Sequence, residues 1–323
     1  MPRLLVAGFI FVILLAPFAQ AQPQREVLSF QAPSRNGPVT VTAELFLPPG
    51  AAPGAVDAKL PAMLLHHGSG GVSDAREYAY AREFTAMGVA SIIPDSFTPR
   101  GVKSTVTDQG TVSTNDMLAD AFGALKAAAA HPRIDPTRIG IAGFSKGGAV
   151  ALRAALQVIA DRYAPDGPRF ALHVPFYPSC ETHYRDTRTT GAPILMLLGG
   201  ADTYAGTASC SSVAESLKAG GARLELVIYP NAQHGWDGGG AAWLQPSGEN
   251  WSKCFFVQQA DLGWVEQTSG IRTAGPDGRP NADAPKALAV CRTRGVSGGP
   301  DAATKAASLG ALKQAMRETF KLN

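Results

Sequence analysis

Short apolar segments alternate with longer helix-like segments from residue 27 to about residue 240. The run at 60–65 is apolar without a break, which is typical of a parallel strand that is covered on both faces. Between such runs lie segments with helical periodicity, such as the alanine-rich stretch 115–130. This alternation predicts an α/β fold, with a mostly parallel central sheet of about eight strands and helices on both faces.

The chain begins this pattern with two segments, 27–30 and 39–47, that alternate apolar and polar residues and predict an antiparallel hairpin at the edge of the sheet. Further strands are expected at 60–65, 89–93, 138–142, 170–176, 194–198 and 224–229. Helices are expected at 74–87, 115–130, 146–163, 211–219 and 301–320.

The segment 241–300 breaks this alternation and is rich in Gly, Pro, Trp and polar residues. Within it, 255–259 and 264–268 predict a small hairpin. We interpret the segment as a decoration of one domain that spans 22–323 and ends in an amphipathic helix. An independent module is the alternative interpretation.

The N-terminus has the pattern of an export signal. A positive start is followed by an apolar run over 4–16 and by Ala19 and Ala21, which predicts cleavage before Gln22. A membrane span needs about 20 apolar residues, and Pro17 and Gln20 interrupt this run earlier, so an uncleaved anchor is the weaker alternative. Residues 1–21 are therefore expected to be a signal peptide, and the protein to be periplasmic or secreted.

Charge and hydropathy exclude two other classes of protein. The chain has 29 basic and 26 acidic residues with no long run of either sign, whereas a nucleic-acid binder typically carries a basic stripe. Only one long apolar stretch exists, at the N-terminus, which excludes a polytopic membrane protein. The expected partner is therefore a small molecule, with no nucleic acid and no membrane after signal cleavage.

Ser145 is the candidate nucleophile. It is the central residue of Gly143-Phe144-Ser145-Lys146-Gly147, between an expected strand and an expected helix. Such a strand-to-helix turn projects the serine hydroxyl above the carboxyl edge of the sheet, at a helix N-terminus. A glycine-rich turn without chemistry is the alternative.

A serine nucleophile needs a base and an acid that orients the base, and in this architecture they follow the serine in the order acid, then histidine. Asp202 follows the strand 194–198, and His234 follows the strand 224–229, so both are expected at the same sheet edge as Ser145. The rival histidine is His183 and the rival acids are Asp186 and Asp237. His173 is expected inside a strand, as a core residue.

An oxyanion hole is expected from two backbone N–H groups. One belongs to Lys146, the residue after the nucleophile, and the other to the glycine-rich loop after the strand 60–65, where Ser69 is favoured and Gly68 is next.

Three further residues are candidates for substrate binding. Arg100 follows the strand 89–93 and is expected either to bind a substrate carboxylate or to pair with a surface acid. Tyr204 and Trp236 follow Asp202 and His234, and either line the acyl pocket or pack within loops.

With these motifs identified, the chain resembles the α/β-hydrolase superfamily and, within it, the dienelactone hydrolase family. The similar segments are H-H-G-S-G-G, D-S-F-T-P-R-G, G-F-S-K-G-G, G-G-A-D and N-A-Q-H-G-W. The resemblance implies the α/β-hydrolase fold, a triad of Ser145, Asp202 and His234, and activity on ester or lactone bonds without a cofactor or metal. The enzymes that give the family its name use a cysteine nucleophile, so Ser145 favours a general esterase-like activity.

The four cysteines are Cys180, Cys210, Cys254 and Cys291, and in an exported protein they are expected to form disulfides. Their spacing contains no C-x-x-C, which argues against a zinc site. Three pairings are possible, and free buried thiols are a further alternative. Cys180 and Cys210 both follow strands at the same sheet edge, so we favour Cys180 with Cys210 and Cys254 with Cys291.

The sequence therefore predicts an exported serine hydrolase that cleaves carboxylic esters or lactones through an acyl-enzyme. A peptidase of the prolyl-oligopeptidase-like kind is an alternative, although no propeller-sized domain is present to restrict access. A catalytically inactive hydrolase fold that acts as a binding protein is the third hypothesis.

Overall fold

A computed structural model describes residues 24–34, 37–49, 59–276 and 278–322. The predicted signal peptide, residues 1–21, lies outside the described residues. In the described part of the chain, no helix is long and apolar enough to cross a membrane.

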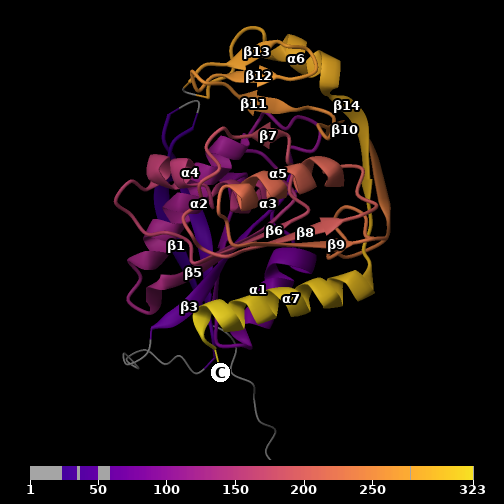
Figure 1. The fold of residues 1–323 in the computed structure, drawn as a ribbon. Coiled ribbons are helices and arrows are strands. Elements are labelled where there is room, and N and C mark those ends of the chain that lie inside the picture. The colour runs from indigo at the N-terminus through magenta and orange to yellow at the C-terminus, as the bar shows by residue number, and fades with distance from the viewer. Residues whose placement is uncertain (1–23, 35–36, 50–58, 277, 323) are drawn as a thin grey trace, which may run out of the picture.

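The centre of the molecule is an eight-stranded sheet in the order β1-β2-β4-β3-β5-β6-β8-β9 (Figure 1). Its strands are β1 (Gln24–Ala32), β2 (Val39–Leu47), β3 (Leu60–His66), β4 (Ala90–Pro94), β5 (Ile134–Phe144), β6 (Leu172–Phe176), β8 (Ile194–Gly199) and β9 (Leu224–Tyr229). β2 pairs antiparallel with β1 and β4, and every other pairing in this sheet is parallel. The mostly parallel sheet and its edge hairpin confirm the prediction from the apolar pattern.

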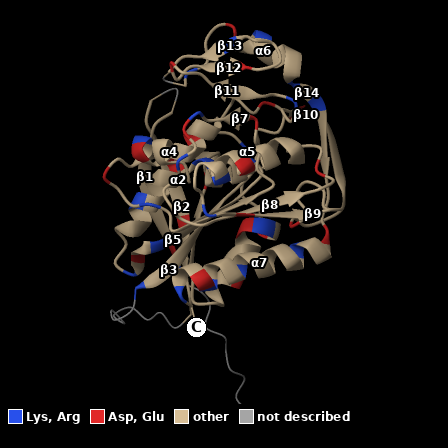
Figure 2. Ribbon diagram, in the orientation of Figure 1, with Lys and Arg blue, Asp and Glu red and all other residues tan. Residues whose placement is uncertain are grey.

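Helices cover both faces of this sheet (Figure 1). The helices on one face are α2 (Thr114–Ala129), α3 (Lys146–Arg153), α4 (Gln157–Tyr163) and α5 (Thr207–Ala219). The other face packs against α1 (Ala79–Thr85) and α7 (Ala302–Phe320), whose Leu312, Met316 and Phe320 are buried. The charged residues of α7 are mostly basic, with one acidic residue, Glu318, near the C-terminal end of the helix (Figure 2). A short 3-10 helix, η2 (Thr98–Arg100), follows β4.

The helix expected over 146–163 is two helices, α3 and α4. The chain leaves the helical path between them because its backbone pairs with a neighbouring loop. Leu156 forms an isolated bridge with Thr189, the N–H of Gln157 donates to the carbonyl oxygen of Arg188, and the N–H of Thr190 donates to that of Ala155. Pairing with a distant segment is not visible in a local helical pattern.

The segment between β9 and α7 forms a separate layer, which we call the cap (residues 243–298). Two antiparallel strands, β10 (Trp243–Asn250) and β14 (Thr293–Gly298), run between this layer and the core along one side of the molecule (Figure 1). The cap also contains α6 (Ala284–Cys291) and β11 (Phe256–Gln258), β12 (Trp264–Glu266) and β13 (Arg272–Ala274). β11 and β12 are the hairpin expected from the sequence, and β11 pairs with β7 (Thr182–His183) of the core.

Disulfide bonds join Cys180 to Cys210 and Cys254 to Cys291, which is the pairing favoured from the sequence. The first bond connects the loop after β6 to α5, close to the loop that follows β8. The second connects the two ends of the cap segment that contains its short strands. All four cysteines are buried.

The helix expected over 74–87 begins as a π-helical turn, η1 (Asp74–Tyr78), and continues as α1. This turn carries Glu77, which is fully buried. One carboxylate oxygen accepts the N–H of Ser73, while the other, Oε1, is buried without a hydrogen-bond partner in the described structure. Burial raises the pKa of Glu77 to about 7, although the charge of Arg76 opposes the shift.

We expect the Glu77→Gln variant to be more stable than the wild type at pH 8. Between the ordinary pKa of 4.5 and about 7, the folded chain holds a proton that the unfolded chain releases, so the free energy of unfolding falls as the pH rises through this range. The loss is about 2–4 kcal/mol, and a neutral glutamine avoids it. Urea unfolding at pH 5 and pH 8 measures it. Glu215→Gln, at an exposed site on α5, is the control, and equal pH dependence in both variants contradicts the expectation.

Candidate active site

The turn between β5 and α3 holds Ser145 in a strained backbone conformation, with φ 57° and ψ −114°. Such a conformation is sparsely populated for a residue with a side chain and concentrates at functional sites. Two glycines make the turn possible. A Cβ at Gly143 would lie 2.0 Å from the carbonyl oxygen of Gly147, and one at Gly147 would lie 2.2 Å from that of His66.

The structure brings Ser145, His234 and Asp202 into one hydrogen-bonded chain. His234 Nε2 lies 2.8 Å from Ser145 Oγ, and His234 Nδ1 lies 2.8 Å from Asp202 Oδ2. Ser145 comes from the end of β5, Asp202 from the loop after β8, and His234 from the loop after β9, as the sequence predicts. The arrangement allows the imidazole to take a proton from the serine hydroxyl while the carboxylate faces its other nitrogen.

Asp202 is almost fully buried, at 6% exposure, and its two carboxylate oxygens have different partners. Oδ1 accepts the backbone N–H groups of Tyr204 and Ala205, and Oδ2 faces His234. Burial alone would raise the pKa of Asp202, but the charge and hydrogen bond of His234 hold it below its ordinary value. The carboxylate is therefore ionised and fixed in orientation.

The peptide between Gly68 and Ser69 lies beside the turn that carries Ser145, since a Cβ at Gly68 would lie 3.3 Å from that of Ser145. The N–H of Ser96 donates to His67 Nε2, so the neutral imidazole carries its proton on Nδ1, which donates to the carbonyl oxygen of Gly68 at 2.8 Å. Burial lowers the pKa of His67 and keeps it neutral. In a trans peptide the C=O and the N–H point in opposite directions, so this contact fixes the direction of the Ser69 N–H.

Lys146 is the first residue of α3, so its N–H has no acceptor within that helix. Its side chain is buried and turns away to a loop, where Nζ donates to the carbonyl oxygens of Gln109 and Val112 and to Thr105 Oγ1. Burial lowers the pKa of Lys146 to about 7. The Lys146 side chain therefore holds the loop 105–112 against the turn that carries Ser145.

Gln109 was not among the residues that the sequence singles out, yet it contacts several parts of the site. Its Oε1 accepts from Ser69 Oγ at 2.9 Å, and its Nε2 donates to the hydroxyl of Tyr204 at 3.0 Å. Its backbone N–H donates to Glu249 of the cap at 2.9 Å. A polar residue in a long irregular loop carries no sequence pattern that separates it from solvated glutamines.

The rival residues lie elsewhere. The ring of His183 packs on Phe255, with its Nε2 3.5 Å from Ser209 Oγ. Asp186 forms an exposed ion pair with Arg188. Asp237 is buried, but its partners are Arg76 and the hydroxyl of Tyr177. Nδ1 of the core histidine His173 donates to the carbonyl oxygen of Ala151, and burial lowers the pKa of His173 to about 4.

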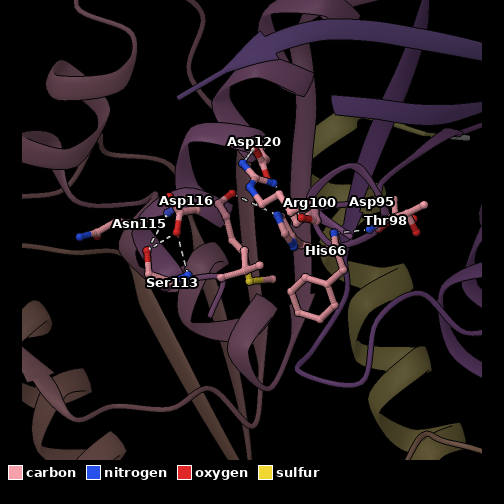
Figure 3. A network of polar contacts seen from close by, with 12 residues as sticks. His66, Asp95, Thr98, Arg100, Ser113, Asn115, Asp116 and Asp120 are labelled. Atoms are coloured by element: carbon pink, nitrogen blue, oxygen red, sulfur yellow. Dashed lines mark hydrogen bonds and ion pairs between the residues drawn. The ribbon is translucent and has the colours of Figure 1, made fainter. Parts of the chain in front are cut away.

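Of the candidate substrate-binding residues, only Tyr204 lines the cavity that contains Ser145. Arg100 is a correction: both of its terminal nitrogens bind the carboxylate of Asp120, at 2.8 and 2.9 Å, and both side chains are buried (Figure 3). Its partner is thus an interior acid, neither a surface acid nor a substrate. Trp236 is also a correction, because its side chain is fully buried, packs edge-to-face against Tyr177, and donates to Ser308.

The cavity that contains Ser145 and His234 has a volume of about 420 Å³ and lies between the core and the cap. Glu249 and Asn250, at the end of β10, hydrogen bond to the loops that carry Gln109 and Thr203. Directly after the cap, the N–H of Gly299 donates to the carbonyl oxygen of His234. Among the described residues, no group of His, Cys, Asp and Glu is arranged to hold a metal ion.

Known proteins resemble this chain in sequence and in fold. A model of the dienelactone hydrolase family matches residues 50–242. A dienelactone hydrolase-like promiscuous phosphotriesterase from metagenomic libraries has a similar structure, with a TM-score of 0.58 and 15% identity over 91% of this chain and 98% of that chain. Esterase 2 of Thermogutta terrifontis, phosphonylated by cyclosarin, gives 0.54 and 21% over 68% and 87%. These structural similarities show the fold. No curated protein matches the sequence.

Proposed function

Since this chain belongs to the dienelactone hydrolase family and is a hydrolase acting on ester bonds, we propose that it cleaves carboxylic esters or lactones through an acyl-enzyme formed on Ser145. The observation that carries the proposal is the hydrogen-bonded chain from Ser145 through His234 to Asp202. The chain order of the three residues and the strained turn at Ser145 support it.

In the proposed reaction, Ser145 Oγ attacks the carbonyl carbon of the ester while its proton passes to His234 Nε2. Asp202 keeps the other imidazole proton on Nδ1 and stabilises the imidazolium. The backbone N–H groups of Lys146 and of Ser69, or of Gly68, donate to the oxyanion of the tetrahedral intermediate.

Collapse of this intermediate breaks the bond to the alcohol oxygen, which leaves with the proton from His234. A water molecule then attacks the acyl-enzyme, with His234 again as the base. This step releases the acid, and Ser145 regains its hydroxyl proton from His234.

We also propose that the protein acts outside the cytoplasm, on a small-molecule ester, after removal of residues 1–21. The pairing of all four cysteines in two buried disulfides supports this, since disulfides persist in oxidising compartments. In this proposal residues 22–323 are one hydrolase domain, and 241–300 are its decoration.

Paraoxon tests the nucleophile directly. The serine oxygen displaces p-nitrophenolate from phosphorus and retains the diethylphosphoryl group, so one equivalent of the yellow product is expected per protein. Peptide mass mapping is expected to find the group on Ser145, and hydrolysis of p-nitrophenyl butyrate to stop. Ser145→Ala is expected to remain unlabelled and inactive. Ser179→Ala, a second serine on the cavity wall, is the matched control. Labelling at another residue, or hydrolysis by Ser145→Ala, contradicts the proposal.

A further inference from the structure

The cap forms part of the wall of the cavity that contains Ser145. The core contributes the polar side of this cavity, including Ser145, His234 and Gln109. The cap contributes a largely apolar side, with Trp251 in the turn before β11, Phe256 at the start of β11 and Leu288 on α6. The volume of the cavity, about 420 Å³, lies in the range of about 300–1,000 Å³ that is usual for small-molecule sites.

The two aromatic rings of this wall are half-buried and lie near each other, with centroids 6.3 Å apart and planes at 55°. The indole N–H of Trp251 donates to Glu249 Oε2 at 3.3 Å, so its polar atom is already satisfied. The two rings therefore present apolar surface to a ligand, and their faces can pack against another aromatic ring.

A disulfide bond between Cys254 and Cys291 connects two parts of this wall. Cys254 lies between Trp251 and Phe256 along the chain, and its disulfide partner Cys291 lies one helical turn after Leu288. The bond thus joins the segment that carries the rings to the helix that carries the leucine. A wall fixed in advance loses less conformational entropy when a ligand binds.

The arginines that border the cavity are paired with acids. Arg153 lies 2.7 Å from Glu181, and both side chains are largely buried. Arg292 pairs with Glu249, which is almost fully buried. Their charges are compensated within the protein, so the cavity is better suited to a neutral group than to an anion.

The cavity adjoins a second one of about 770 Å³, which shares Trp251, Phe256 and Leu288 as lining residues. The apolar wall therefore borders both cavities, and the cavity that contains Ser145 is by itself large enough for a group much larger than the methyl of an acetate.

We propose that the cap wall formed by Trp251, Phe256 and Leu288 is a subsite for a neutral aromatic group carried by one half of the ester. The inference rests on the proposed function, whose Ser145 lies in the same cavity. Aromatic esters are then preferred over aliphatic esters of similar reactivity, and the cap determines this preference.

Two matched pairs of esters test the preference, with hydrolysis followed by pH-stat titration. Methyl phenylacetate against methyl butyrate varies the acyl half, and benzyl acetate against butyl acetate varies the alcohol half. The wild type is expected to have a kcat/KM about tenfold higher for the aromatic member of at least one pair. Equal values within both pairs overturn the proposal.

Leu288→Ala and Phe256→Ala are expected to reduce the preference by about tenfold, because kcat/KM falls further for the aromatic member of a pair than for the aliphatic member. Val290→Ala is the matched control, because Val290 lies on the same helix, is 58% exposed, and lines neither cavity. A preference that both wall variants retain overturns the proposal.

Calorimetric titration of the Ser145→Ala variant with the same esters tests the subsite without catalysis. Tighter binding of an aromatic member, lost when Leu288→Ala is added, supports the subsite even if the wild type hydrolyses none of the esters, and the proposed function alone then fails. Hydrolysis that depends on Ser145 but shows no aromatic preference in either rate or binding removes the subsite and leaves the proposed function standing.

Discussion

The Asp202→Asn variant is expected to hydrolyse p-nitrophenyl butyrate with a kcat about 10⁴-fold below that of the wild type. An asparagine at this position can keep its carbonyl oxygen on the N–H groups of Tyr204 and Ala205, as Oδ1 does now. Its NH₂ group then faces His234 Nδ1 and donates to it. The imidazole proton is forced onto Nε2, which can no longer accept a proton from Ser145.

The Asp202→Asn variant is expected to keep the fold, since both backbone contacts of Asp202 are retained. The melting temperature of the variant is therefore expected to be close to that of the wild type, which separates a lost base from an unfolded protein. Asp186→Asn is the matched control, because that carboxylate pairs with Arg188 at the surface. A full-rate Asp202→Asn enzyme, or an equal loss in Asp186→Asn, rules out the assigned role of Asp202.

Arg100→Met is expected to lower the free energy of unfolding by about 3–5 kcal/mol, because it leaves the carboxylate of Asp120 buried without its partner. Asp120 has no exposed surface, and burial raises its pKa while the two hydrogen bonds from Arg100 oppose that shift. Without Arg100 the carboxylate must take up a proton or remain charged in the interior. The loss of stability is therefore expected to be larger at pH 8 than at pH 5.

The double variant Arg100→Met with Asp120→Leu separates the cost of an unpaired charge from the value of the pair. It is expected to recover most of the lost stability, since a well-packed apolar pair replaces a buried ion pair at little cost. Urea unfolding of the two variants measures the difference. If the double variant is as unstable as Arg100→Met, the loss comes from the missing ion pair, and the unpaired carboxylate of Asp120 is not its cause.

The sheet and the three residues of the proposed triad could be predicted because each rests on a local pattern. Unbroken apolar runs mark strands covered on both faces, and the turn at Ser145 is specified by the glycines on either side of it. The loops with Asp202 and His234 follow strands directly, so chain order alone places them at one edge. Each of these features is set by residues that are neighbours in sequence.

Contacts between distant segments could not be predicted in this way. Arg100 looked available for a substrate because nothing in the sequence connects it to Asp120, twenty residues further on. Trp236 follows His234 directly, yet its ring turns into the core and packs on Tyr177. The sequence predicts the hairpin of β11 and β12, but the three-residue strand β13 is too short for a period of two to be recognised. No local pattern shows that β11 also pairs with β7 of the core.

The place of the cap in the chain has a consequence for how such enzymes diversify. It is inserted between the last strand of the sheet and the last helix, after Ser145, Asp202 and His234 have all been placed by the core. Its two ends meet as the antiparallel pair β10 and β14, so the inserted loop starts and finishes at one point. Its disulfide lies wholly within the insertion. Recombination that exchanges residues 243–298 between homologues would therefore transfer the whole proposed subsite for an aromatic group together with its disulfide. The core that carries Ser145, Asp202 and His234 would stay unchanged.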